Sequence, residues 1–308
     1  MLIGTRARRL LWVVLCAGVA MAGSAEQTPT RTVTDMLGRS VTVPDRPLRL
    51  VSLAPSITET VFALGRGDWL VGVTAFCDYP AAAKALPKIG GTATPSLEDV
   101  VARQPDLVLT TAEGNTRDFL GQLDRLRIPT FALRPDTVDN VLQSIAGLGA
   151  VLDARPAAAR VIADIQARLD AVAARLASQP RPRVLYLIWT DPVIGAGPGS
   201  YLHDLITRAG GQSVVTAGPV PYPRLSWEQI VGWAPEVILL ASHSADLPRG
   251  AASLPAGWAN WQAVPAIRDG RVIALPDDTV LRPGPRVGEG VVHLAEAIHP
   301  EARAARSQ

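Results

Sequence analysis

One segment of the sequence occurs twice, and this repeat constrains the possible folds more than any other feature. P-S-L-E-D-V-V-A-R-Q-P-D-L-V-L at 95–109 returns as L-S-W-E-Q-I-V-G-W-A-P-E-V-I-L at 225–239, an offset of 130 residues. Both copies have a Ser that can cap a helix, a Glu two residues later, and a Pro between the helix and an apolar strand. Helix–strand units are common enough for chance similarity, but the order of the surrounding elements also recurs. We therefore predict two related α/β halves.

The N-terminal half alternates between strands and helices. A hairpin is predicted over 32–43 and a buried strand over 48–53, followed by a helix that starts at the Ser56 capping box S-I-T-E and ends at Gly65. With a further strand at 71–74, this order predicts a parallel sheet covered by helices. The later elements of this half are predicted to be a helix from Ser96, strands 106–110 and 129–133, and helices 119–126 and 138–152.

A long helix is predicted to divide the chain. Asp153 can cap it, Pro156 suits its first turn, and no breaker occurs before Pro180. About 24 residues at 1.5 Å each give about 36 Å, enough to cross a small domain. This linker helix (153–180) would join two Rossmann-like α/β lobes, and the cleft between the lobes is the expected ligand site. The lobes are predicted to span residues 31–152 and 181–302.

The C-terminal half repeats the order of the first. Its predicted elements are a strand at 184–188, a helix from Ser200 to Gly210, a strand at 213–216, a helix from Ser226, a strand at 272–275 and a last helix from Val287.

The N-terminus has the pattern of a secretory signal peptide. Basic residues lie between positions 6 and 9, and an apolar run of roughly 13 residues at 10–22 precedes the small residues before a cleavage site near Ala25. A membrane anchor is the alternative, but the run is shorter than the about 20 residues that span a bilayer. We therefore expect residues 1–25 to be removed on export.

The cysteines predict no disulfide in the mature chain. Leu15 precedes Cys16, which disfavours a lipid-anchoring signal, and cleavage would leave Cys77 as the single cysteine. Cys77 is either a reactive thiol or, as we favour, a partly buried residue without a role in chemistry.

Charge and motifs argue against nucleic-acid binding and catalysis. The net charge is +2 with Lys and Arg scattered, which does not indicate a nucleic-acid partner. G-A-G-P-G-S at 195–200 lacks the dinucleotide-binding spacing, and the histidines at 293 and 299 do not form the H-E-x-x-H zinc pattern. We therefore predict a protein that is not an enzyme and has no catalytic residues, catalytic cofactor or metal site.

Glu98 and Glu228 occupy equivalent positions in the two repeats. Each follows a capping Ser by two residues, where a carboxylate stabilises the positive end of a helix by about 0.3–1 kcal/mol. That local role is sufficient for either residue alone. Alternatively, two matched acids on a pseudo-symmetric face could contact two basic points of a symmetric partner.

Five other residues are candidates for contact with a ligand. Asp278 and Arg282 lie in the loop P-D-D-T-V-L-R-P-G-P-R, from which they could face a cleft or simply pair with each other. Tyr222 lies between prolines, and Phe76 and Trp189 follow predicted strands. Aromatic side chains on stiff loops suit flat, partly apolar ligands, although packing beneath a loop is an equally ordinary role.

Several segments together resemble a known family. They are T-D-M-L-G-R-S-V-T-V-P at 34–44, L-V-S-L-A-P-S-I-T-E at 50–59 and the two copies of the repeat. These resemble the periplasmic iron-siderophore, haem and cobalamin-binding proteins of ABC importers over about residues 31–300. The resemblance implies two α/β lobes joined rigidly by one helix. It also implies a monomeric periplasmic protein that delivers its ligand to a permease and its ATPase.

Within that family the chain is most similar to the cobalamin-binding members. The similarity is carried by V-G-V-T-A-F-C-D-Y-P at 71–80, V-P-Y-P-R-L-S-W-E-Q at 220–229 and D-x-x-x-R-x-x-P-R at 278–286. It implies cobalamin or a related corrinoid as the ligand. Haem or a ferric siderophore is the alternative within the family, and a periplasmic enzyme or metallochaperone is the alternative on the same scaffold.

The resemblance also assigns roles to individual residues. Asp278 and Arg282 fall on polar ligand contacts, and Phe76 and Tyr222 replace other aromatic pocket residues. Trp189 remains a candidate because it follows a predicted strand, as Phe76 does. Glu98 and Glu228 fall on acids that dock to arginines of the permease. The departures from the family are Thr92, Thr111 and Ile194, which replace pocket aromatics, and Ala209 and Ala295, which replace a pair of disulfide cysteines.

Overall fold

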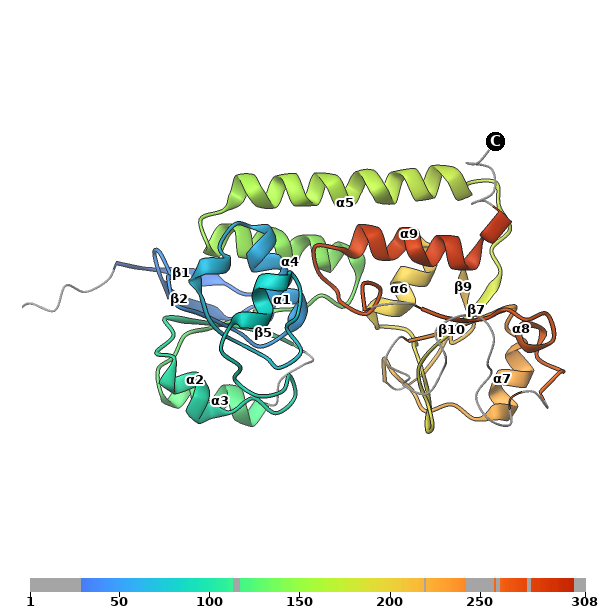
Figure 1. Cartoon of the computed structure of the whole chain (residues 1–308), viewed down its shortest axis with the longest axis horizontal. Helices are drawn as coiled ribbons and strands as arrows, with labels where there is room; N and C mark the ends of the chain where they lie inside the picture. The colour runs from blue at the N-terminus through green and yellow to red at the C-terminus, as the bar shows by residue number, and fades with distance from the viewer. Residues whose placement is uncertain are drawn as a thin grey trace, which may run out of the picture.

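The computed structural model describes residues 29–112, 117–218, 220–241, 258, 261–275 and 278–301. The predicted signal peptide lies outside these ranges. Figure 1 shows two α/β lobes side by side, with the helix α5 (Arg155–Leu176) running along both of them. Within the ranges given, no helix combines the length and apolar character needed to cross a bilayer.

The N-terminal lobe is built on a parallel sheet with the strand order β4-β3-β5-β6. The residues of β3 and β5 are buried, as expected for a parallel sheet covered on both faces. The strands are β3 (Leu50–Ser52), β4 (Leu70–Val73), β5 (Leu107–Thr111) and β6 (Thr130–Leu133). The helices are α1 (Pro55–Ala63), α2 (Leu97–Ala102), α3 (Arg117–Arg125) and α4 (Val138–Val151), with the short 3₁₀ helices η1 (Gly67–Trp69) and η2 (Ala81–Ala85). The predicted hairpin is β1 (Thr30–Thr34) paired with β2 (Ser40–Pro44).

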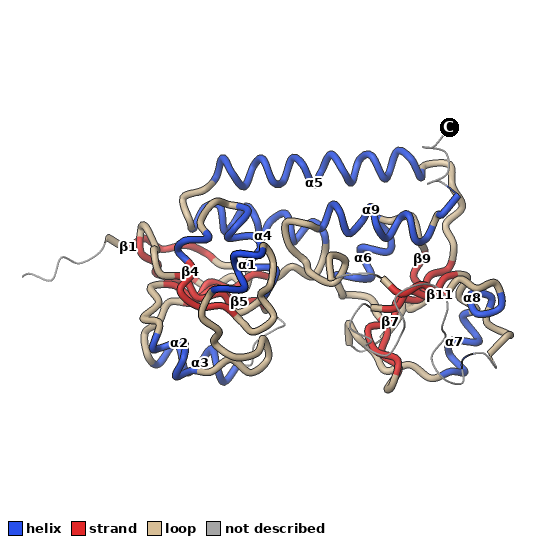
Figure 2. Tube along the Cα trace, in the orientation of Figure 1, coloured by secondary structure: helices blue, strands red, loops and turns tan. Residues whose placement is uncertain are grey.

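The C-terminal lobe repeats this topology. Its parallel strands have the order β9-β7-β10-β11, the counterpart of β4-β3-β5-β6. An additional antiparallel strand, β8, pairs with the end of β7 and was not predicted. The strands are β7 (Arg183–Thr190), β8 (Val193–Gly195), β9 (Gln212–Ser213), β10 (Val237–Leu240) and β11 (Val272–Ala274). The helices are α6 (Tyr201–Arg208), α7 (Trp227–Trp233), α8 (Pro265–Arg268) and α9 (Val287–Ile298). Figure 2 shows the strands of each lobe between two sets of helices.

A layer of helices connects the lobes. α5 packs against α4 of the N-terminal lobe and α9 of the C-terminal lobe. Its buried stripe includes Ile165, Leu169 and Val172, which belong to one apolar cluster with Ile145 on α4 and Leu294 on α9. Because this cluster is continuous across both lobes, a wide rotation of one lobe would expose apolar surface, which favours a fixed arrangement.

Polar contacts between α4 and α6 reinforce this arrangement. The backbone N–H of Val138, at the start of α4, donates to the Asp204 carboxylate at 2.8 Å. Arg208 lies 2.8 Å from the carboxylate of Asp139. A side chain of the C-terminal lobe therefore satisfies a free N–H group at a helix start in the N-terminal lobe.

Two of the predicted helix starts are wrong. Ser56 does not cap α1: the N-cap is Ala54, and Pro55 occupies the first turn, where its fixed φ and absent N–H are tolerated. The N-cap of α5 is Ala154 and not Asp153. The helix starts predicted at Ser96, Ser200 and Ser226 are confirmed, and each of these side chains accepts a backbone hydrogen bond as the N-cap.

Candidate ligand-binding site

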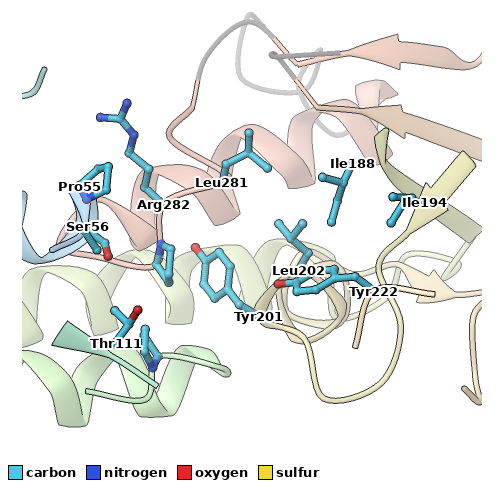
Figure 3. Close-up of a pocket in the computed structure, with 13 residues that line it drawn as sticks. Pro55, Ser56, Thr111, Ile188, Ile194, Tyr201, Leu202, Tyr222, Leu281 and Arg282 are labelled. Atoms are coloured by element: carbon cyan, nitrogen blue, oxygen red, sulfur yellow. The ribbon is translucent and has the colours of Figure 1, made fainter. Parts of the chain in front are cut away.

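A pocket of about 500 Å³ lies between the lobes. The N-terminal lobe contributes one wall of the pocket. This wall is formed by the start of α1, directly after β3, and by Thr111 at the end of β5. Open α/β sheets bind ligands in the crevice beyond the carboxyl ends of their strands, and this pocket has that position in both lobes. The lining residues, most of which Figure 3 labels, are Ala54, Pro55, Ser56, Thr111, Pro135, Ile188, Ile194, Tyr201, Leu202, Tyr222, Leu281, Arg282 and Pro283.

Two of the five predicted ligand contacts line this pocket directly. They are Tyr222, on the loop before α7, and Arg282, on the loop between β11 and α9. Thr111 and Ile194 also line it. Neither side chain is aromatic, so these two positions place no ring in the pocket wall.

The other three predicted contacts lie beside the pocket lining. Phe76 is 61% exposed, and its carbonyl accepts a hydrogen bond from Arg282 at 3.5 Å. Asp278 accepts a hydrogen bond from Arg282 at 3.0 Å. Trp189 is 42% exposed, follows Ile188 in β7 and pairs with Ile194 in β8. Phe76 and Trp189 are thus exposed aromatic residues, and each contacts or pairs with a residue that lines the pocket.

Arg282 is held by carboxylates from both lobes. Its Nη1 donates to Glu59 at 3.0 Å and to Asp78 at 2.6 Å, and its Nη2 donates to Asp278. Burial alone would lower the pKa of Arg282, but the hydrogen bonds with Asp78 and Glu59 raise it above its usual value. The hydrogen bond from Arg282 also lowers the pKa of Asp78. Arg282 is therefore a permanent cation whose charge is already matched.

Arg286 forms a second inter-lobe ion pair with the same glutamate. Its Nε and Nη2 donate to the two carboxylate oxygens of Glu59 at 2.8 and 2.9 Å, a bidentate arrangement. The guanidinium also lies 4.1 Å from the centre of the Tyr79 ring. The Glu59 side chain is only 1% exposed. The loop 278–286 is thus fixed against α1.

Backbone contact brings this loop still closer to α1. A Cβ atom added at Gly284 would lie 3.1 Å from the carbonyl oxygen of Ser56, so glycine permits the close approach. The loop that carries Arg282 therefore forms a wall of the pocket and a contact between the lobes at once.

Three residues of this region were not predicted as site residues. Glu59 had a complete local explanation as part of the supposed capping box at Ser56. Arg286 is the last residue of the D-x-x-x-R-x-x-P-R pattern and was not singled out within it. Tyr201 lies in a helix whose sequence resembles any half-buried helix, and no signal distinguished it.

Glu98 and Glu228 are not among the residues that line the pocket. Both are exposed in the first turns of α2 and α7, which lie on the side of the lobes away from α5 (Figure 1). Hydrogen bonds from its own backbone N–H and from Ser226 lower the pKa of Glu228. Both lobes therefore present an acidic residue at equivalent places on this side.

Cys77 is buried at 1% exposure, which favours the structural interpretation over a reactive thiol. Thr58 donates to its Sγ at 3.1 Å, and the Thr74 hydroxyl lies at the same distance. In the part of the chain with described coordinates, no three His, Cys, Asp or Glu residues are grouped to hold a metal ion.

Comparison with known proteins gives one consistent family. The family described as periplasmic binding protein matches residues 50–279. The vitamin B12-binding protein of Vibrio parahaemolyticus is 29% identical over 83% of this chain and 92% of its own length. The structure of the periplasmic vitamin B12-binding protein BtuF of Vibrio cholerae has a TM-score of 0.72 at 27% identity, covering 85% of this chain and 99% of that chain. The periplasmic heme-binding protein RhuT from Roseiflexus sp. RS-1 has a TM-score of 0.72 at 30% identity, covering 82% and 98%.

Proposed function

The chain belongs to the periplasmic binding protein family, and on that basis we propose that it captures cobalamin, or a related corrinoid, between its lobes for an ABC importer. The observation that carries this proposal is the inter-lobe pocket of about 500 Å³, which has an apolar lining and Arg282 in its wall. Pockets with a mainly apolar lining and a few placed polar groups are typical of small-molecule sites. The vitamin B12-binding names of the relatives support corrinoids as the ligand class.

The exposed aromatic rings beside the pocket support a ligand that extends beyond it. A corrin with its nucleotide loop is larger than the pocket, so part of the ligand would contact residues around the lining. We propose that Phe76 and Trp189 cover the projecting macrocycle and that Tyr222 contacts it within the pocket. Burial of exposed ring surface by the ligand stabilises the complex.

The polar contacts would come from the loop 278–286. We propose that Arg282 and Asp278 contact the polar side chains of the ligand. The hydrogen bonds of Arg282 to Glu59, Asp78, Phe76 and Asp278 all leave from its terminal nitrogens Nη1 and Nη2. Because the carboxylates hold the guanidinium in place, little side-chain entropy would be lost when the ligand binds.

Delivery to the membrane would use the side of the lobes that lies away from α5. We propose that Glu98 and Glu228 dock to basic residues of a permease, which works with its ATPase, and that residues 1–25 direct export to the periplasm. The division into lobes at 31–152 and 181–302 around a linker at 153–180 is part of the same proposal, as is a monomeric state.

Haem is the second candidate ligand. The 30% identity with a heme-binding protein over 82% of the chain favours it, and so do Thr111 and Ile194, which line the pocket without an aromatic ring where the resemblance implies one. A ferric siderophore is the third candidate, and an enzyme or metallochaperone on this scaffold is the remaining alternative.

Calorimetry on the mature chain tests the proposal. Cyanocobalamin, cobinamide, haemin and ferric siderophores would each be titrated into protein that starts after residue 25. We expect saturable heat with one corrinoid per chain and weaker heat or none with haemin. No heat with either corrinoid would refute the cobalamin proposal, and tight binding of haemin alone would replace it with the second candidate.

A further inference from the structure

We propose that Tyr201 is a specificity-determining residue of this site, whose hydroxyl donates a hydrogen bond to an uncharged oxygen of the ligand, such as an amide carbonyl. This inference rests on the proposed function and extends it to a residue and a chemical group. Tyr201 is the first residue of α6, directly after the capping Ser200.

The Tyr201 hydroxyl is buried and has no hydrogen-bond partner among the described residues. The residue is 3% exposed and lines the inter-lobe pocket. Figure 3 shows the ring projecting from α6 across the pocket toward the side where Ser56 lies. Buried polar groups nearly always have a partner, so a hydroxyl placed in a pocket wall without one is available to a ligand.

The hydroxyl is a neutral donor. Burial, followed by the nearby Tyr222, Asp204 and Glu59, raises the pKa of Tyr201 well above its usual range. The proton therefore stays on the phenol throughout the physiological range. A protonated phenol can donate one hydrogen bond to an oxygen or nitrogen acceptor of the ligand.

The surroundings favour an uncharged acceptor over a carboxylate. Arg282 is the one charged residue among the described residues that line the pocket. Its guanidinium already faces the carboxylates of Glu59, Asp78 and Asp278. An anionic group near Tyr201 would lose its hydration without gaining an unmatched cation, whereas an amide carbonyl needs only a hydrogen-bond donor.

Tyr186 provides a matched control. It lies on β7 with 0% exposure, and its hydroxyl likewise has no partner among the described residues. Unlike Tyr201, it does not line the pocket. Replacing either tyrosine by Phe removes one buried hydroxyl and keeps the ring, so the two variants differ in whether that hydroxyl could reach a ligand.

The experiment compares Tyr201→Phe and Tyr186→Phe with the unmodified chain in calorimetric titrations with cyanocobalamin and haemin. For one lost neutral hydrogen bond we expect Tyr201→Phe to bind cyanocobalamin about 3- to 10-fold more weakly. Tyr186→Phe should bind it as tightly as the unmodified chain. Thermal melts should show neither variant destabilised, since each loses an unsatisfied hydroxyl.

Each outcome decides a different point. Equal affinity of Tyr201→Phe and the unmodified chain for cyanocobalamin would overturn the role of Tyr201 and leave the proposed function standing. Equal weakening in both variants would indicate a general packing effect and would also overturn it. If the unmodified chain bound haemin, a dicarboxylate, more tightly than cyanocobalamin, the proposal that Tyr201 donates to an uncharged ligand oxygen would be overturned. Failure of the unmodified chain to bind any corrinoid would instead refute the proposed function.

Discussion

Replacing Glu59 by Gln should strongly destabilise the protein, because the buried Glu59 carboxylate pairs with two arginines of the other lobe. The Glu59 side chain is 1% exposed and accepts three hydrogen bonds from two arginines, at 2.8, 2.9 and 3.0 Å. Glutamine keeps one acceptor oxygen but removes the negative charge, so Arg286 and Arg282 would face each other across an amide. Removing one partner of a buried ion pair costs about 3–5 kcal/mol, and we expect a loss in that range.

Urea denaturation, followed by both circular dichroism and tryptophan fluorescence, would measure this loss. Agreement between the two probes is required before a single free energy of unfolding is derived. Glu98→Gln is the matched control, because Glu98 is an exposed helix residue and its loss should cost less than about 1 kcal/mol. If Glu59→Gln cost no more than Glu98→Gln, the buried pair would not hold the lobes together as argued.

A double-mutant cycle would assign the loss to the pair itself. Glu59→Leu leaves the Arg286 charge without its carboxylate, and Arg286→Met leaves the Glu59 charge without its Arg286 partner. The double variant removes both charges. We expect the double variant to be more stable than the sum of the single losses implies, by at least about 1 kcal/mol. Additive losses would mean that the two residues stabilise the fold independently.

Two further predictions concern the docking side and the loop contact. Glu98→Ala with Glu228→Ala should leave ligand affinity intact, because neither acid lines the pocket. The same double variant should abolish uptake by cells, because it removes both proposed contacts with the permease. Loss of affinity in the purified double variant would make them pocket or folding residues. Gly284→Ala should destabilise the fold by about 1–3 kcal/mol, since its Cβ would lie 3.1 Å from the Ser56 carbonyl oxygen. Gly232→Ala, in α7 with no atom within 4 Å of the added Cβ, should instead be neutral or stabilising by about 0.5–1 kcal/mol in urea melts.

The periodic parts of this fold are predictable from sequence because they depend on local patterns. The capping serines at 96, 200 and 226, the apolar stripe of α5 and the parallel strands all follow from spacing that the structure reproduces. β8 is only three residues long and follows a turn, so it has too little periodicity to be detected.

The polar part of the site is not predictable in this way. Glu59 matches a capping pattern locally, and that pattern hides its real partners, which lie 223 and 227 residues away. Only tertiary packing brings Arg282 and Arg286 to it. Because nearby residues fully account for the capping pattern at Glu59, the sequence does not indicate that two distant arginines bind the same carboxylate.

The duplication and the pocket are connected through the starts of two equivalent helices. α1 follows β3 in the N-terminal lobe, and α6 follows the equivalent strand β7, after β8, in the other. Pro55 and Ser56 of the first and Tyr201 of the second line the same pocket, so the repeat brings two helix starts to face each other. The two helix starts carry different residues, so the two walls of the pocket offer different groups to a ligand. The buried Tyr201 hydroxyl, opposite a proline and a serine, is one such difference.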